Sequence, residues 1–177
     1  MAHPGTNREG GFMREDVLKI SDFIETENIY LDVELTDKEA VLKFIAQTAG
    51  QNSLVTNDEM LFKGLALREE SMSTGVGQGI AFPHTTTPER DQAAVMIIRL
   101  STPVPFDAID DQDVDIVFAI IIPESNQTQH LQILARVSRL CRKTEFTGVV
   151  RRAKDPQRLK DAIKGLEDEI TGFFYQS

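Results

Sequence analysis

The stretch "VDIVFAIII", residues 114–122, is apolar at every position except Asp115. A strand with one solvated face alternates apolar and polar residues, whereas an unbroken apolar run is typical of a strand covered on both faces. Such cover needs a layer of helices on each side of the sheet. The stretch therefore predicts a central strand in a layered α/β domain.

Three further segments are expected to be strands of the same sheet. "NIYLDVEL" (28–35) alternates apolar and polar residues, as a half-buried strand does. "GIAFP" (79–83) and "AAVMIIRL" (93–100) are short apolar runs between turn signals. Because strands and helical patterns interleave along the chain, the predicted fold is a three-layer α/β/α sandwich around a mixed β-sheet.

Four helices are expected around this sheet. One begins after Thr36, whose pairing with Glu39 resembles a capping box, and a second begins at Asn57. A third follows the polar loop "PESNQTQ", and the last opens at Pro156 with Asp155 as its cap. The second helix is predicted to carry Met60, Leu61, Gly64 and Leu65 on one side, and the third to carry a stripe formed by Leu131, Leu134, Val137 and Leu140.

Composition restricts the class of protein. The chain has 177 residues, 41% hydrophobic and 27% charged, which is typical of one folded domain. Its net charge of -9 argues against a nucleic-acid binder, which needs a concentrated basic footprint. The last 47 residues, 131–177, are nevertheless basic, with 10 Lys+Arg against 6 Asp+Glu. Solvated helix faces account for this excess, and a basic docking surface for an acidic partner is the alternative.

The domain is expected to span residues 21–169. Residues 1–20 are predicted to be a flexible N-terminal tail, and residues 170–177 a C-terminal tail. The tail's Phe173, Phe174 and Tyr175 either dock back on the domain or contact another copy, which leaves the oligomeric state open between monomer and dimer.

The compartment follows from two absences in the sequence. No apolar run is long enough to span a bilayer, and the N-terminus has no secretory apolar segment, so a cytoplasmic location is expected. The single cysteine, Cys141, excludes an intramolecular disulfide and is expected to be a small core residue.

The stretch richest in chemistry is "ALREESMSTGVGQGIAFPHTTT", residues 66–87. Gly75, Gly77 and Gly79 alternate along it and can adopt backbone angles closed to other residues. They lack the lysine of a phosphate-binding P-loop and precede a strand, so nucleotide binding is not expected. They indicate either a tight turn into a strand or a place where a ligand or second chain approaches the backbone closely.

His84 follows Pro83 at the end of this apolar run. A histidine that ends a buried strand behind a stiff proline has an imidazole with little freedom to turn. Near neutral pH an unprotonated imidazole is a competent nucleophile, and its second nitrogen is free to be held by a hydrogen bond. The alternative is a hydrogen-bonded histidine at the edge of the core.

Two other residues are candidates for the same site. His130 is expected in the first turn of a helix, where free backbone N–H groups favour an anion, unless it is an ordinary first-turn residue. Arg68 ends a helix and enters the glycine loop, so its guanidinium either grips a phosphoryl group on His84 or satisfies the C-terminus of its own helix.

Together "REESMSTGVGQGIAFPH" and "VPFDAIDDQDVDIVFAIIIPESNQTQHLQIL" resemble the enzyme IIA domain of the bacterial phosphoenolpyruvate-dependent sugar phosphotransferase system. The resemblance is to the fructose/mannitol type, which includes the nitrogen-regulatory IIA proteins, and it covers about residues 21–169. Sugar-transport members often occur fused to other domains, whereas regulatory members commonly stand alone. A chain of this length slightly favours a regulatory or free-standing IIA protein.

The resemblance implies a histidine phosphocarrier and therefore a phosphotransferase. By this resemblance His84 accepts a phosphoryl group from the carrier protein HPr and passes it to a IIB domain. Arg68 and His130 line the site, and Thr74 with the loop glycines Gly75 and Gly77 binds the phosphoryl group or supports the loop. No metal or bound cofactor is required. Because the phosphoryl group arrives on a protein, a shallow site with an exposed, partly apolar rim is expected.

Three rival hypotheses remain. The aspartates of "FDAIDDQDVD" (106–115) suggest a hard-cation site, although their spacing fits no EF-hand loop and a solvated turn accounts for them. A zinc hydrolase using His84 and His130 would need a third ligand. A regulator that binds target proteins and uses phosphorylation of His84 only as a switch needs no onward transfer.

Overall fold

The computed structural model describes residues 17–173, with side chains through residue 170. Its six strands form one mixed sheet in the order β1-β5-β6-β3-β2, with β4 also pairing β6. β1 is parallel to β5, β5 antiparallel to β6, β3 and β4 parallel to β6, and β2 antiparallel to β3. The strands are β1 (Ile29–Val33), β2 (Gly75–Gly77), β3 (Ile80–Ala81), β4 (His84–Thr87), β5 (Ala94–Val104) and β6 (Val114–Pro123).

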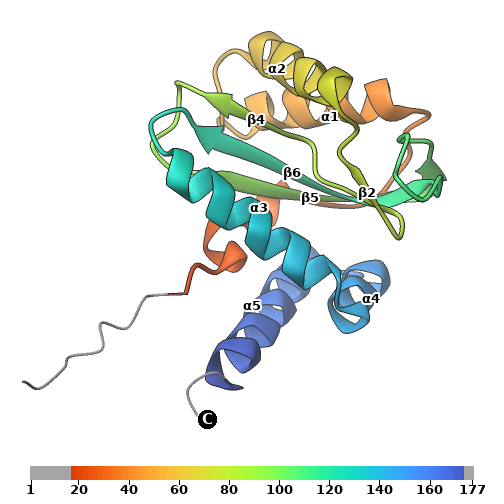
Figure 1. Ribbon diagram of the computed structural model, residues 1–177, viewed down its shortest axis with the longest axis vertical. Coiled ribbons are helices and arrows are strands. Elements are labelled where there is room, and N and C mark those ends of the chain that lie inside the picture. Colours follow the sequence, from red (N-terminus) through yellow and green to blue (C-terminus); the bar gives the residue numbers. More distant parts are fainter. Residues whose placement is uncertain (1–16, 174–177) are drawn as a thin grey trace, which may run out of the picture.

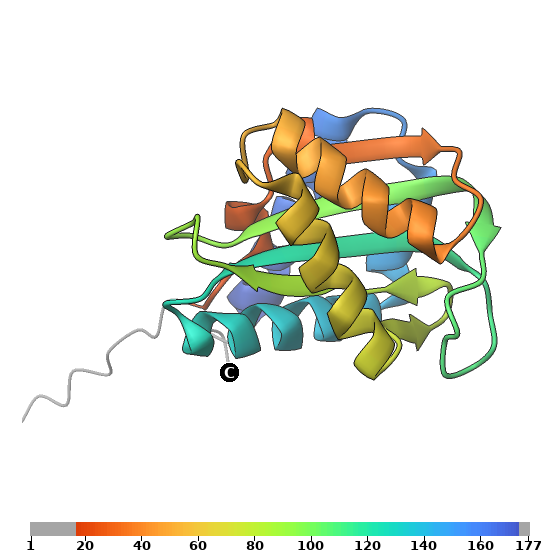
Figure 2. The same cartoon turned by 90° about the horizontal axis from the view of Figure 1, so that it is seen from above.

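Five α-helices cover the two faces of the sheet, as Figure 1 shows. Two of them lie on one face and are seen in front of the sheet in Figure 2, and three lie on the other face. Two short 3-10 helices, η1 (Ile20–Phe23) and η2 (Thr26–Asn28), precede β1. The helices are α1 (Lys38–Gln51) and α2 (Asp58–Ser71) on the first face, and α3 (Gln127–Cys141), α4 (Thr144–Arg152) and α5 (Pro156–Phe173) on the second.

The central strand β6 contributes to two separate cores. Phe118 and Ile120 pack into the core beneath α3, α4 and α5, while Val117 and Ile121 pack beneath α1 and α2. Successive side chains of a strand point to opposite faces, so a strand in the middle of a sandwich must be apolar at both. The predicted α/β/α sandwich around a mixed sheet is confirmed, and Cys141 lies in the second-face core as expected.

Some local expectations are wrong. Asp37, not Thr36, caps α1, because its carboxylate accepts the Ala40 N–H at 2.8 Å while the Thr36 hydroxyl donates to that same carboxylate. Met60 and Leu131, expected to share the apolar side of their helices with core residues such as Leu61 and Val137, are 62% and 71% exposed. Helix α4 and the two 3-10 helices were not expected from the sequence, because each is too short to give a clear apolar period.

The sequence-based domain boundaries also need correction at both ends. Ile20, assigned to the N-terminal tail, is completely buried, and Leu18 packs against the same core. Ile170, assigned to the C-terminal tail, lies in α5 and extends its apolar stripe by one more turn. The rest of the expected tails, residues 1–16 and 174–177, lie outside the described residues. None of the helices within residues 17–173 is long and apolar enough to cross a membrane.

A buried carboxylate joins the first described segment to the last helix. Glu167 on α5 is completely buried and accepts the backbone N–H groups of Ile20 at 2.9 Å and Ser21 at 3.0 Å. Arg136 on α3 lies 3.4 Å from the same carboxylate. This one side chain therefore joins η1, α3 and α5. Each buried donor that lost its acceptor would cost about 1–3 kcal/mol.

We therefore expect Glu167→Ala to lower the free energy of unfolding by about 3 kcal/mol, since it strands two backbone donors and a cation. Urea denaturation measures this loss. Glu169→Ala, an exposed position on the same helix, is the matched control and should change stability by less than about 0.5 kcal/mol. Equal effects of the two substitutions would contradict the assigned role.

Candidate functional site

His84 lies at a break in the edge of the sheet. β3 and β4 lie end to end along the same side of β6, with Ala81 opposite Val117 and His84 opposite Ile120. Between them, Phe82 and Pro83 leave the strand geometry, and proline has no N–H to donate. The sequence suggested that His84 ends the preceding strand. In the structure it is instead the first residue of β4.

The break leaves a backbone carbonyl free to hold the imidazole. The Phe82 N–H donates to the Thr74 carbonyl at 2.9 Å, and the Phe82 carbonyl lies 2.7 Å from His84 Nδ1. A carbonyl can only accept, so Nδ1 carries the proton. The lone pair of the ring is therefore on Nε2, and the ring is fixed in one tautomer and one orientation.

Arg68 lies directly against that lone pair. Its Nε–H donates to His84 Nε2 at 3.0 Å, and its Nη1 donates to the Met72 carbonyl at 3.0 Å. One turn earlier on α2, a Cβ on Gly64 would lie 2.6 Å from the Thr85 hydroxyl, so only glycine lets the helix approach β4 this closely. The close packing brings Arg68 over the imidazole, and its bond to the Met72 carbonyl satisfies the C-terminus of its own helix, which was one of the two alternatives expected from the sequence.

His130 approaches the same imidazole from the other face of the sheet. It lies in the first turn of α3, whose N-cap Asn126 accepts the Gln129 N–H at 2.9 Å. The His84 and His130 rings are 5.6 Å apart between centroids and nearly perpendicular. A cavity of about 400 Å³ adjoins His130 and is bounded by Thr86, Glu124 and Leu131 among others. The structure therefore brings His84, Arg68 and His130 together.

The electrostatics of the site keep both imidazoles neutral. Burial lowers the pKa of His84 below its usual 6.5, and electrostatic repulsion by Arg68, and by His130 when that ring is protonated, lowers it further, against the opposing effects of the Phe82 carbonyl and Glu69. Burial and Arg68 also lower the pKa of His130. An unprotonated Nε2 facing a guanidinium is an electron-pair donor beside an anion-binding group.

The glycine loop lies beside the site and does not line it. The space in front of Gly75 is filled by Ala108, where an added Cβ would come within 2.9 Å. Gly77, at a φ of 95°, faces Asp110. The chain's own atoms therefore occupy the room that these glycines create, which favours loop support over phosphoryl contact.

Thr74 is also held by its own chain. Both its N–H and its hydroxyl donate to the carboxylate of Glu69, the latter at 2.5 Å. Glu69 was not singled out from the sequence, where it is one of two adjacent glutamates after Arg68. Its burial is the only distinguishing signal, and it arises from tertiary packing.

The rim of the site is exposed and apolar, as expected, but the imidazole itself is not. Leu67 and Met72, on either side of Arg68, and Leu131, next to His130, are each about 70% exposed. His84 is only 8% exposed. A shallow site was expected from the sequence, whereas the Nε2 of the ring is covered by the half-buried Arg68.

The aspartates of residues 106–115 are largely bound to protein groups. Asp107 pairs with Lys38 at 2.7 Å, Asp110 accepts the Gln78 N–H at 2.8 Å, and Asp115 pairs with Arg151 at 2.8 Å. Among the residues that the structure describes, no three His, Cys, Asp or Glu side chains are grouped to hold a metal ion. The cation-site and zinc-hydrolase hypotheses gain no support from these positions.

Comparison with known proteins identifies the family. Residues 22–165 match the family described as "Phosphoenolpyruvate-dependent sugar phosphotransferase system, EIIA 2". The chain belongs to this family of enzyme IIA domains, which supports a role in phosphoryl transfer.

Both branches of the family are represented among the relatives. A nitrogen regulatory protein from Bradyrhizobium diazoefficiens is 31% identical over 146 residues, covering 82% of this chain and 95% of the relative. The fructose-specific EIIA component of Haloferax volcanii is 30% identical over 148 residues, covering 84% and 96%.

Solved structures agree with this placement. The IIA-Ntr protein of Neisseria meningitidis superposes with a TM-score of 0.76 at 26% identity, covering 81% of this chain and 98% of that one. The mannitol IIA of Escherichia coli, solved in complex with its phosphorylated IIB, shares the fold with a TM-score of 0.67 at 18% identity over 80% of this chain and 99% of that one.

We expect His84 to titrate below pH 6.5 in histidine-selective NMR spectra, and Arg68→Gln to raise its pKa, because the substitution removes a cation and opens the ring to water. Since the unfolded chain takes up a proton near pH 6.5 and the folded ring does not, folding stability should fall as the pH drops below that value. A His84 pKa at or above 6.5 in the unsubstituted protein would contradict this electrostatic description.

Proposed function

We propose that this protein is a histidine phosphocarrier in which His84 receives a phosphoryl group from an HPr-like protein and passes it on, to a IIB domain or in exchange with a regulatory partner. One observation carries the proposal: Phe82 holds the Nδ1 proton while Arg68 covers the free lone pair of Nε2. A fixed, neutral nucleophile beside a guanidinium suits phosphoryl transfer, where positioning and charge neutralisation do most of the work.

His84 loses no proton during the transfer of the phosphoryl group. The Nε2 lone pair forms the new P–N bond as the P–N bond of the donor phosphohistidine breaks, and that electron pair returns to the donor imidazole. Nδ1 keeps its proton on the Phe82 carbonyl. The Nε–H of Arg68 leaves His84 Nε2 and donates to a phosphoryl oxygen, and a guanidinium is suited to grip such a group with two parallel hydrogen bonds.

His130 supplies a second donor. Its ring lies beside that of His84, and its lowered pKa keeps it neutral at pH 7, so its one N–H can donate to a phosphoryl oxygen. The exposed Leu67 and Leu131 are the sequence neighbours of Arg68 and His130, and together with the exposed Met72 they give a partner protein an apolar surface to cover. HPr and a IIB domain would be met in the cytoplasm, the location expected from the sequence.

Incubation with phosphoenolpyruvate, enzyme I and HPr tests the assignment of His84. Intact-protein mass analysis should show one acid-labile phosphoryl group on the unsubstituted protein and none on His84→Ala. His130→Ala should still be labelled, at a rate lower by about 100-fold, the usual cost of losing one donor to developing charge. Labelling of His84→Ala at the normal level would refute the site.

A regulatory role is the second candidate, favoured by the relatives named nitrogen regulatory proteins. A dianion on His84 would change the docking of a target protein on the apolar rim through charge and desolvation. Transfer of the phosphoryl group from His84 to a IIB domain distinguishes a phosphocarrier from a regulator. We expect phosphorylated protein mixed with a fructose- or mannitol-type IIB domain to lose its phosphoryl group within seconds to minutes. Retention of the group, with altered binding to a target protein, would instead establish the switch.

A further inference from the structure

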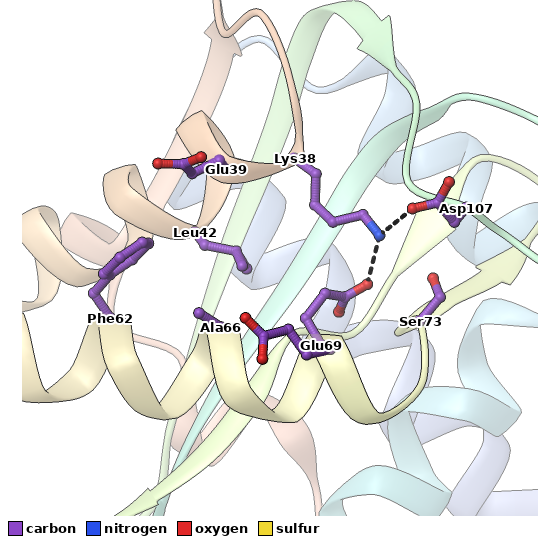
Figure 3. Close-up of a pocket in the computed structure, with 9 residues that line it drawn as sticks. Lys38, Glu39, Leu42, Phe62, Ala66, Glu69, Ser73 and Asp107 are labelled. Carbon is purple, nitrogen blue, oxygen red and sulfur yellow. Dashed lines mark hydrogen bonds and ion pairs between the residues drawn. The ribbon is translucent and has the colours of Figure 1, made fainter.

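A buried ion pair lies behind the site, on the side of α2 that faces α1. Glu69, the neighbour of Arg68, is 7% exposed although it carries a charge. Figure 3 shows its carboxylate and that of Asp107 converging on the ammonium group of Lys38, at the start of α1. The Lys38 Nζ lies 3.1 Å from Glu69 and 2.7 Å from Asp107. A cavity of about 640 Å³ opens beside this cluster.

The Glu69 carboxylate is fully engaged. One oxygen accepts from Lys38, the other accepts the Thr74 hydroxyl, and the Thr74 N–H is shared between the two at 3.1 Å. Charged and hydrogen-bonded groups are retained in a protein interior only when paired in this way. Glu69 thus joins the last turn of α2 to the start of the glycine loop.

From Thr74 the chain of hydrogen bonds continues to the nucleophile. The Thr74 carbonyl accepts the Phe82 N–H at 2.9 Å, and the Phe82 carbonyl accepts the Nδ1 proton of His84 at 2.7 Å. The backbone of Phe82 is therefore held on both sides, by Thr74 through its N–H and by the imidazole through its carbonyl. Fixing Thr74 fixes the acceptor that selects the tautomer of His84.

We propose that Glu69, held by Lys38, is a positioning residue for phosphoryl transfer: through Thr74 and Phe82 it sets the tautomer and direction of the His84 imidazole. This proposal rests on the proposed function of His84. Glu69 touches neither the imidazole nor the rim, so it acts on the rate of transfer and not on the docking of the phosphoryl donor. Its position next to Arg68 adds a second effect, because the same contacts fix the last turn of the helix that carries the guanidinium.

Glutamate is needed here because the site presents three donors. A glutamine in the same volume would keep one accepting oxygen, but its NH₂ would face either the Lys38 ammonium, which only donates, or the Thr74 hydroxyl, which would have to turn from donor to acceptor while the Thr74 N–H lost one of its two acceptors. Glu69→Gln therefore weakens the attachment of Thr74 without opening a cavity.

Two measurements on Glu69→Gln test the proposal. In ¹⁵N NMR spectra of the unphosphorylated protein, the His84 tautomer with the proton on Nδ1 should lose population to the one with the proton on Nε2. The rate of phosphoryl transfer is measured at a series of phospho-HPr concentrations. The maximal rate of labelling should fall at least tenfold, while the half-saturating concentration of phospho-HPr should change less than twofold. A purely structural role would not alter the tautomer ratio.

Glu70→Gln is the matched control. Glu70 neighbours Glu69, lines the same cavity and is exposed, so the substitution changes the charge equally and should leave both measurements unchanged.

A folded Glu69→Gln protein with an unchanged tautomer and a labelling rate within twofold of normal would overturn the proposal. If Glu69→Gln does not fold, Thr74→Val, which removes only the hydroxyl accepted by Glu69, takes its place and must shift the tautomer in the same direction. Absence of labelling in the unsubstituted protein would overturn the proposed function, whereas the tautomer measurement would still test the role of Glu69.

Discussion

The hydrogen bond from His84 Nδ1 to the Phe82 carbonyl is the interaction on which the site depends. It can form because the Phe82 carbonyl is not used in the sheet: the chain leaves strand geometry at Phe82 and Pro83, and the β6 residue Ile120 donates its N–H to the Pro83 carbonyl at 2.9 Å instead. Pro83 marks the interruption and Thr74 accepts the remaining Phe82 N–H. The backbone thereby chooses which imidazole nitrogen carries the lone pair, before any partner arrives.

The sandwich architecture explains how two side chains from different helices reach this imidazole. Because β4 lies at an edge of the sheet, helices from both layers can reach it: α2 brings Arg68 from one face, and α3 brings His130 from the other. The missing side chain of Gly64 lets α2 close on β4. A central strand, covered by both layers, would have given the same histidine no access to a partner protein.

The sequence predicted what periodicity and motif encode, and it missed what tertiary packing decides. The central strand 114–122, the Asn57 cap and the grouping of His84, Arg68 and His130 followed from apolar pattern, capping chemistry and family resemblance. The burial of Glu69, and its contact with Lys38 more than 30 residues away in sequence, leave no local signal. Leu131 was placed in the apolar stripe of its helix by its spacing, yet it is exposed beside His130, where an apolar side chain suits a docking rim more than a core.

The central claim is that the lone pair of His84 lies on Nε2, because Phe82 holds the Nδ1 proton. The position of the phosphorus atom in the phosphorylated protein tests it most directly. Long-range ¹H–¹⁵N and ³¹P NMR spectra of the protein labelled with ¹⁵N-histidine and phosphorylated through HPr distinguish the two isomers of phosphohistidine. The hydrogen-bond geometry predicts a single P–Nε2 bond on His84, with the Nδ1 proton still protected from solvent exchange. Phosphorus on Nδ1 would contradict the account, since that nitrogen could react only after giving up the Phe82 carbonyl.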